Sequence, residues 1–248
     1  MQNYIEVDNT QIWTEKWGKG VPVILISGGP GCCNYMEPVA EIIGDTSEVI
    51  MFDPRGCGRS LFDGEGYDLE TALKDLETIR TEYGVDKWVV IGHSWGADLG
   101  LAYALRHSGS ILGFISMCGT GIQNDRDWKE SYKRNKAQIG ELLPEFAYEP
   151  NKIVHRSLID SWRAFIKQPS LLRDISELDL PTLFVFAEKD IRPSWPIEQL
   201  SFLMKNSRYI ELEGAEHYIW QTKQDELAEV LREFIKRINY TKVKPMIK

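Results

Sequence analysis

Short apolar runs that alternate with helical stretches constrain the fold of this chain more than any other feature. Asp68 is an N-cap residue before a segment in which leucine and isoleucine recur at helical spacing. A second helical stretch runs from about Ala97 to His107. Largely apolar runs before and between these helices are typical of buried parallel strands: Val21–Ile26, Glu48–Phe52, Trp88–Ile91 and Leu112–Met117. Strands and helices that follow one another through short links predict an α/β fold, with a mostly parallel central sheet flanked by helices.

The alternation stops in the middle of the chain and then resumes. Residues 121–178 are helical in composition and mix charged with aromatic side chains. Two further strands are expected over Pro181–Phe186 and Arg208–Leu212, followed by a last amphipathic helix. We therefore predict one core domain, formed by residues 1–120 and 179–248, into which the middle segment is inserted as a short helical cap. The alternative for the inserted segment is a set of further core helices.

Composition and charge exclude several classes of function. The 248 residues carry a formal net charge of -8, so the chain lacks the excess of Lys and Arg that binding to a phosphate backbone requires. No apolar run approaches the ~18 residues of a membrane-spanning helix, and the N-terminus does not resemble a secretion signal. We expect a cytoplasmic protein that acts on a small molecule or short peptide, without a nucleic-acid or membrane partner. The oligomeric state is left open.

The cysteines are expected to be small buried residues. Cys32 and Cys33 are adjacent, which is not the spacing of a metal site, and Cys57 and Cys118 stand alone. The glycine patterns that bind phosphates, G-x-x-x-x-G-K-[ST] and G-x-G-x-x-G, are both missing from the sequence. We therefore expect neither a metal nor an organic cofactor.

Gly92-His93-Ser94-Trp95-Gly96 is the strongest functional motif. It matches G-x-S-x-G and lies between an expected buried strand and a helix, the context in which a sharp turn exposes a serine nucleophile. Glycines at both ends leave room for the turn to approach neighbouring backbone. The helix that begins after Ser94 directs N–H groups and a positive dipole end toward developing negative charge. Ser94 is therefore the predicted nucleophile.

A serine hydroxyl needs a base to remove its proton, and His217 is the predicted base. It lies in a loop directly after the last expected strand, which places it at the same sheet edge as Ser94. The other histidines have simpler explanations. His93 is expected to point away from the nucleophile, His107 ends a helix where a cation is favourable, and His155 is interpreted as a surface residue.

The acid of the predicted triad should follow an intermediate strand, because this arrangement orders serine, acid and histidine along the chain. Asp190 follows the strand that ends near Phe186 and is the predicted acid. Glu188 in the same stretch is the alternative. The acid would orient the imidazole and stabilise its charged form without taking the proton.

An oxyanion needs two N–H donors. Trp95, the residue after the nucleophile, is expected to supply one of them. The loop Gly28–Gly31, which follows the strand Val21–Ile26, is expected to supply the other, because its glycines let the backbone approach a substrate closely.

Together these residues resemble the α/β-hydrolase superfamily over nearly the whole chain, and its proline iminopeptidase branch in particular. Ser27-Gly28-Gly29-Pro30-Gly31 is similar to the His-Gly-Gly-Pro-Gly of that branch. The stretch from Asp53 to Ser60 is similar to its Asp-Gln-Arg-Gly-x-Gly-x-Ser. The resemblance implies that Gly29 and Trp95 supply the oxyanion donors, and that attack on a carbonyl gives an acyl-enzyme. The chain departs from the branch at three motif positions: Ser27, Pro54 and His93.

The inserted segment is also shorter than in that branch. Aminopeptidases of the branch hold the free amine of the substrate with cap glutamates, one of which follows a tryptophan. The stretch after Trp162 offers no glutamate at the comparable place, so the candidates for this role lie elsewhere: Glu130, Glu141, Glu145, Glu149 and Asp160. Solvated helix faces explain these acids equally well.

The sequence thus predicts a serine hydrolase that acts on a small ester or amide through an acyl-enzyme. Peptides or amides with an N-terminal proline are the most specific candidate substrates. The alternative enzyme is a carboxylesterase or lactonase, favoured by His93 and the short cap, and a ligand-binding protein of the same fold is a third hypothesis. Because His217 must be neutral to act as base, activity is expected to fall below about pH 6.5.

Overall fold

The computed structural model describes residues 1–123 and 125–243, with side chains described as far as Ile238. Residue 124 of the predicted cap and residues 244–248 of the predicted core domain therefore lie outside the described part. Within that part, eight strands form one sheet: β1 (Gln2–Val7), β2 (Thr10–Gly18), β3 (Val21–Ile26), β4 (Ser47–Phe52), β5 (Trp88–His93), β6 (Ile111–Met117), β7 (Thr182–Ala187) and β8 (Ser207–Leu212).

Parallel strands form most of the sheet, and an antiparallel pair closes one edge. The order is β1-β2-β4-β3-β5-β6-β7-β8, in which β1 and β2 are antiparallel and β2 runs antiparallel to β4. The chain passes from β3 to β4 on one side and later returns to place β5 on the other side of β3. The carboxyl ends of β3 and β5 therefore form a topological switch point, where open α/β sheets bind their ligands.

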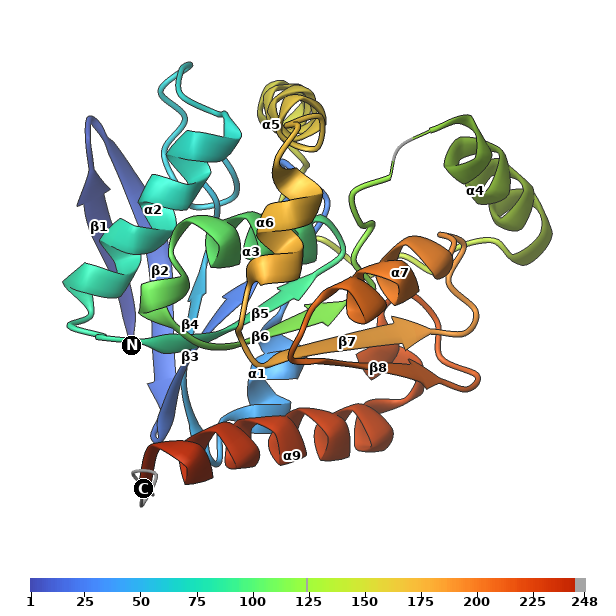
Figure 1. Cartoon of the computed structure of the whole chain (residues 1–248). Coiled ribbons are helices and arrows are strands. Elements are labelled where there is room, and N and C mark those ends of the chain that lie inside the picture. The colour runs from blue at the N-terminus through green and yellow to red at the C-terminus, as the bar shows by residue number, and fades with distance from the viewer. Residues whose placement is uncertain (124, 244–248) are drawn as a thin grey trace.

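Helices cover both faces of the sheet (Figure 1). One face carries α1 (Glu37–Ile43), α8 (Ile219–Thr222) and α9 (Gln224–Val243). The other face carries α2 (Leu69–Glu82), α3 (Trp95–Arg106) and α7 (Trp195–Leu203). An apolar cluster fills the space between sheet and helices on each face. This arrangement confirms the predicted α/β fold. In the described ranges, no helix is both long enough and apolar enough to cross a bilayer.

Among the described residues between β6 and β7, in the segment predicted as a cap, there are three helices: α4 (Arg126–Ile139), α5 (Lys152–Phe165) and α6 (Leu171–Glu177). α5 and α6 bury apolar side chains, among them Leu158, Trp162 and Ile175, in the same cluster as α2 and α3. α4 has no buried residue among those described, and it projects from the body of the molecule (Figure 1). The segment therefore combines two helices that pack on the core with one that does not, and its status as a separate cap stays a prediction.

The elements differ from the predicted ones mainly where a helix is short. α1 and α7 are not among the predicted helices, because each spans only two turns or slightly more and has a proline in its first turn. α3 begins at Trp95, two residues before the expected start, because the turn at Ser94 passes directly into the helix. Asp68 caps α2 as expected, and its side chain accepts the N–H of Thr71 at 2.8 Å.

Candidate active site

Ser94 lies on the turn between β5 and α3, where strand changes to helix within one residue. Its φ of 55° and ψ of -126° lie outside the regions that non-glycine residues favour, so the turn is strained. The flanking glycines are required by close packing. A Cβ atom on Gly96 would lie 2.2 Å from the carbonyl oxygen of Ile26, and one on Gly92 would lie 2.2 Å from that of Gly96. This local geometry is the one expected of a nucleophile turn.

His217 and Asp190 form a buried pair at the same edge of the sheet. Asp190 follows β7 and His217 follows β8, and these parallel strands end on the edge to which β5 brings Ser94. Nδ1 of His217 lies 2.5 Å from Oδ2 of Asp190, and both residues are less than 5% exposed. A carboxylate bonded to Nδ1 leaves Nε2 as the nitrogen that can accept a proton.

The Asp190 carboxylate has a second partner, the cationic Arg192. The backbone N–H and Nη1 of Arg192 donate to Oδ1 of Asp190 at 2.9 and 3.1 Å. Burial by itself would raise the pKa of Asp190, but Arg192 and His217, whose ring is protonated at acid pH, outweigh burial and hold that pKa at about 2. Asp190 is therefore a carboxylate at neutral pH, as an orienting acid has to be.

The imidazole of His217 is neutral at pH 7. Burial lowers the pKa of His217 below its ordinary value, although Asp190 acts in the opposite direction. Ser94 is 6% exposed, and its Oγ makes no hydrogen bond with a described residue. The structure thus shows a bond between His217 and Asp190. Ser94 lies at the same edge of the sheet, but its hydroxyl makes no hydrogen bond with His217. Such bonds often form only when substrate is bound.

The loop after β3 lies against the nucleophile turn. A Cβ atom on Gly28 would lie 2.5 Å from Cβ of Ser94, so only glycine fits at this position. The N–H of Gly28 donates to the Tyr35 hydroxyl at 2.6 Å. The N–H groups of Gly29 and Trp95, the predicted oxyanion donors, donate to no residue in the described part of the chain. They are therefore available to a ligand.

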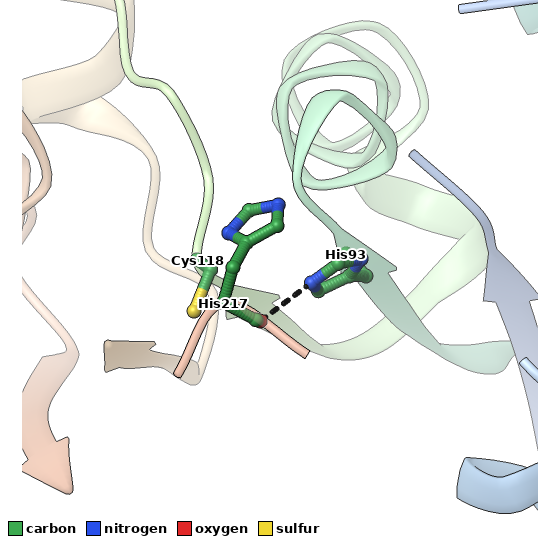
Figure 2. Close-up of side chains that lie close together, drawn as sticks. All are labelled: His93, Cys118 and His217. Atoms are coloured by element: carbon green, nitrogen blue, oxygen red, sulfur yellow. Dashed lines mark hydrogen bonds between the residues drawn. The ribbon is translucent and has the colours of Figure 1, made fainter. Parts of the chain in front are cut away.

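His93 is fully buried and lies against His217, with 4.6 Å between the ring centroids. Its Nδ1 lies 2.8 Å from the Tyr35 hydroxyl and its Nε2 lies 3.0 Å from the carbonyl oxygen of His217. Figure 2 shows the His93 ring directed at the backbone of His217, while the His217 ring projects away from it. The sequence carries no local signal for these contacts, because the partners lie 58 and 124 residues away along the chain.

His93, Cys118 and His217 form a cluster in which one potential ligand atom from each lies within 4.8 Å of the others (Figure 2). Both nitrogens of His93 already have partners, and Nδ1 of His217 is bonded to Asp190. At most Cys118 Sγ and His217 Nε2 remain, fewer than the three or four protein ligands of a typical zinc site. Burial also raises the pKa of the Cys118 thiol well above its ordinary value. All four cysteines are free and buried, as expected.

The other residues considered for the triad are Glu188, His107 and His155, and each has a different position or partner. Glu188 is exposed and accepts the N–H of Gly214 at 2.7 Å. His107 is the C-cap residue of α3. His155 is exposed on α5, and its Nδ1 lies 2.7 Å from the carbonyl oxygen of Pro30, so this surface residue contacts the loop after β3.

The loop after β4 carries the second motif noted in the sequence, and its polar side chains hold loops together. Asp53 is fully buried and accepts the N–H of Asn34 at 2.8 Å and two donors of Arg59 at 2.7 Å. Arg55 forms two hydrogen bonds with Asp75 of α2, at 3.0 and 2.6 Å. The motif thus fixes the loops after β3 and β4 relative to α2.

A pocket of about 300 Å³ opens beside His217. Its walls come from the predicted cap and from the loops after β7 and β8, and they include Ile139, Glu141, Leu142, Lys189, Glu216 and His217. Among the five candidate amine-binding acids, Glu141 lines this pocket, but its carboxylate accepts a hydrogen bond from Arg192 Nη1 at 2.7 Å. The other four are exposed at the surface.

The strand order, with a switch point between β3 and β5 and a strained serine turn after β5, is that of the α/β hydrolases. The family model of the alpha/beta hydrolase fold matches residues 21–213. The chain therefore belongs to this family. Membership of this family supports the prediction that the chain is an enzyme.

Comparison with known proteins confirms the resemblance to proline iminopeptidases. The proline iminopeptidase of Neisseria gonorrhoeae is 36% identical over 150 residues, which are 57% of this chain and 46% of that protein. The proline iminopeptidase of Saccharolobus solfataricus is 24% identical over 268 aligned positions, covering 89% of this chain and 86% of that protein. The chain spans about half the length of several curated relatives that it matches.

Solved structures agree on the fold. The crystal structure of proline iminopeptidase from Mycobacterium smegmatis has a TM-score of 0.76 at 16% identity, and the match covers 97% of this chain and 99% of that chain. A thermophilic esterase from Thermogutta terrifontis has a TM-score of 0.73 at 19% identity, covering 96% and 99%. At this level of identity the likeness concerns the fold alone.

Proposed function

We propose that this protein is a serine hydrolase that cleaves a small ester or amide through an acyl-enzyme. In this proposal Ser94 is the nucleophile, His217 the general base and Asp190 the orienting acid, while the N–H groups of Gly29 and Trp95 bind the oxyanion. The observation that carries the proposal is the 2.5 Å bond between His217 and Asp190, at the sheet edge where Ser94 follows β5.

The proposed reaction has two halves. Oγ of Ser94 attacks the carbonyl carbon while Nε2 of His217 takes the hydroxyl proton, and the carbonyl oxygen becomes an oxyanion bound by two backbone N–H groups. Collapse of this intermediate expels an alcohol or amine, which His217 protonates, and leaves an ester on Ser94. Water then attacks the ester with His217 again as base, which releases the acid and restores the enzyme.

Short peptides or amides with an N-terminal proline are the first substrate class that we propose, because curated relatives are proline iminopeptidases. A carboxylesterase or lactonase is the second candidate. It is favoured by the ion pair of Glu141 with Arg192, since this carboxylate beside the pocket already has a cationic partner with which a substrate amine would have to compete. In either case the protein would work in the cytoplasm on a small molecule or short peptide.

A fluorophosphonate probe tests the nucleophile, because it reacts covalently with an activated serine. Wild type should be labelled, whereas Ser94→Ala should lose labelling and lower kcat for p-nitrophenyl butyrate by about 10⁶-fold, as removal of a nucleophilic serine does. The matched control is Ser47→Ala in β4, which removes a buried hydroxyl that has no hydrogen-bond partner among the described residues. A folded wild type that takes up no label contradicts the proposal and favours a ligand-binding protein.

Two substrates separate the candidate activities. Rates on proline naphthylamide and on p-nitrophenyl acetate or butyrate should be measured with the same preparation. Turnover of the prolyl amide supports the aminopeptidase. Ester turnover without any aminoacyl turnover contradicts the aminopeptidase and supports the esterase, and the serine hydrolase stands in both cases.

A further inference from the structure

We propose that His93 and Tyr35 are positioning residues. They fix the positions of the loop Gly28–Gly31, the turn at Ser94 and the base His217 relative to one another. The inference rests on the proposed function, because it names what aligns the groups assigned there. Three hydrogen bonds form a continuous chain through both residues. They join Gly28 N to Tyr35 Oη at 2.6 Å, Tyr35 Oη to His93 Nδ1 at 2.8 Å, and His93 Nε2 to the carbonyl oxygen of His217 at 3.0 Å.

The direction of each bond follows from what its partners can donate. A carbonyl oxygen only accepts, so Nε2 of His93 carries the proton in its bond to His217. Burial lowers the pKa of His93 well below its ordinary value, and the ring is therefore neutral. Its Nδ1 then has no proton and accepts from the Tyr35 hydroxyl. The Tyr35 oxygen in turn accepts the N–H of Gly28.

The chain of bonds reaches three of the proposed catalytic residues, Gly29, Ser94 and His217, through the preceding residue or the main chain. It ends at the residue before Gly29, passes through the residue before Ser94, and ends again on the main chain of His217. The Tyr35 hydroxyl accepts the N–H of Gly28. The N–H of the next residue, Gly29, donates to no described residue and can bind the oxyanion. A neutral His93 also adds no charge beside a His217 ring that becomes cationic during turnover.

Aromatic rings enclose these bonds. The ring centroids of Tyr218 and Trp220 lie 5.2 and 4.8 Å from that of His93, and Phe146 of the predicted cap lies 5.6 Å from Tyr35. A polar group that loses its partner here has no solvent to replace it, so each bond in the chain strongly constrains the positions of its two partners.

Substitutions can separate the two links of His93. His93→Asn retains an acceptor near the place of Nδ1 but is too short to reach the His217 carbonyl. His93→Gln retains a donor near the place of Nε2 but offers Tyr35 no acceptor at Nδ1. Tyr35→Phe removes both bonds of the hydroxyl. The matched control is Tyr218→Phe, since the Tyr218 hydroxyl belongs to the same aromatic cluster and bonds to no described residue.

We expect Tyr35→Phe and both His93 variants to lower kcat for p-nitrophenyl butyrate by about 10- to 100-fold, with KM changed less than about threefold, as a misplacement of about 1 Å does. Fluorophosphonate labelling should slow in parallel, while Tyr218→Phe keeps the wild-type rates. Unchanged kcat in Tyr35→Phe and His93→Asn overturns the proposal, even if their thermal stability falls, because the role would then be structural only.

The ring nitrogens give a readout that needs no activity. In ¹⁵N NMR spectra of wild type, His93 should be the neutral Nε2–H tautomer across the range of about pH 5 to 8 in which ordinary histidines titrate. Tyr35→Phe should shift its Nδ1 resonance most. A His93 ring that titrates in this range, or that carries its proton on Nδ1, overturns the proposal. A wild type that the fluorophosphonate does not label refutes the proposed function. If wild type is labelled and the Tyr35 and His93 variants are labelled equally fast, the positioning role alone is refuted.

Discussion

Asp190 and Glu188 lie two residues apart, yet their side chains bond to different partners: His217 Nδ1 and the N–H of Gly214. We expect Asp190→Asn to lower kcat/KM by about 10⁴-fold, because an amide at this place selects the wrong imidazole tautomer. Glu188→Gln is the matched control and should change the rate less than about twofold, as exposed substitutions usually do. Steady-state rates on p-nitrophenyl butyrate measure both. A larger loss in the Glu188 variant would transfer the role of acid to that residue.

The pH dependence of activity should follow His217. Burial lowers the pKa of this imidazole below the ordinary value of 6.5, even though Asp190 raises it. Below its pKa the ring holds a proton and cannot act as base, so the acid limb of kcat/KM should have its midpoint below pH 6.5. A rate profile with the uncharged butyrate ester measures this midpoint. A midpoint above 6.5, or a rate independent of pH between about 5 and 8, contradicts the assignment.

Local sequence context predicts where Ser94 and His217 lie, because each directly follows a recognisable strand and parallel strands end on one edge. The contacts of His93 cannot be predicted in this way. Its partners come from two other loops, and a histidine in G-x-S-x-G looks the same in the sequence whether or not its ring is bonded. The same holds for Arg192, whose partner Glu141 comes from the middle segment.

At the scale of elements, an ion pair ties the chain after α4 to the site, because Arg192 Nη1 contacts both Glu141 and Asp190. We expect Glu141→Gln to lower Tm by about 2–6 °C, because a largely buried guanidinium loses one of two anions at a cost of about 1–2 kcal/mol. Glu145→Gln, an exposed acid of the same segment, is the control and should leave Tm unchanged. Equal Tm values for the two variants would contradict a stabilising role of this ion pair.

Strands were the elements most readily predicted, since a continuous apolar run indicates burial on both faces. The middle segment was harder for a physical reason. α5 has an apolar stripe that packs on the core, but α4 has none, and a polar helix gives no indication of what it contacts. The helical character and the place of the segment in the chain were therefore easier to predict than its contacts with the sheet.

At the scale of the whole molecule, we expect Asp98 of α3 to make stability depend on pH. Asp98 is 2% exposed and accepts the N–H groups of Thr120 and Gly121, at 3.0 Å each, where the chain leaves β6 for the middle segment. Burial raises the pKa of Asp98 from 3.8 to about 7. The folded state thus holds this proton more tightly than the unfolded state, so the group contributes stability below pH 3.8 that is lost as the pH rises through about 7.

Asp98→Asn should remove this loss, because the amide keeps an acceptor oxygen and never ionises. We expect the Tm of the variant relative to wild type to increase from about pH 5 to about pH 8. Thermal unfolding followed by circular dichroism measures the difference, with the exposed Asp160→Asn as control. A Tm difference that is the same at both pH values would contradict a raised pKa at Asp98.

The overall topology was predictable only in part. Alternating strands and helices predict a parallel sheet with covered faces, and the structure has one. The order of the strands was not predictable, because the side on which β5 joins β3 depends on contacts between segments far apart in the chain. That choice creates the switch point where the site lies.

The isolation of α4 from the core has a consequence for how such a protein can diversify. Its side chains support no part of the interior, and the chain just beyond it forms one wall of the pocket beside His217. Substitutions in α4 itself are little constrained by folding, whereas substitutions in the pocket wall beyond it change which molecules the pocket can admit. Substrate recognition can therefore change during evolution while the reaction stays the same. Related proteins can then share a reaction without sharing a substrate.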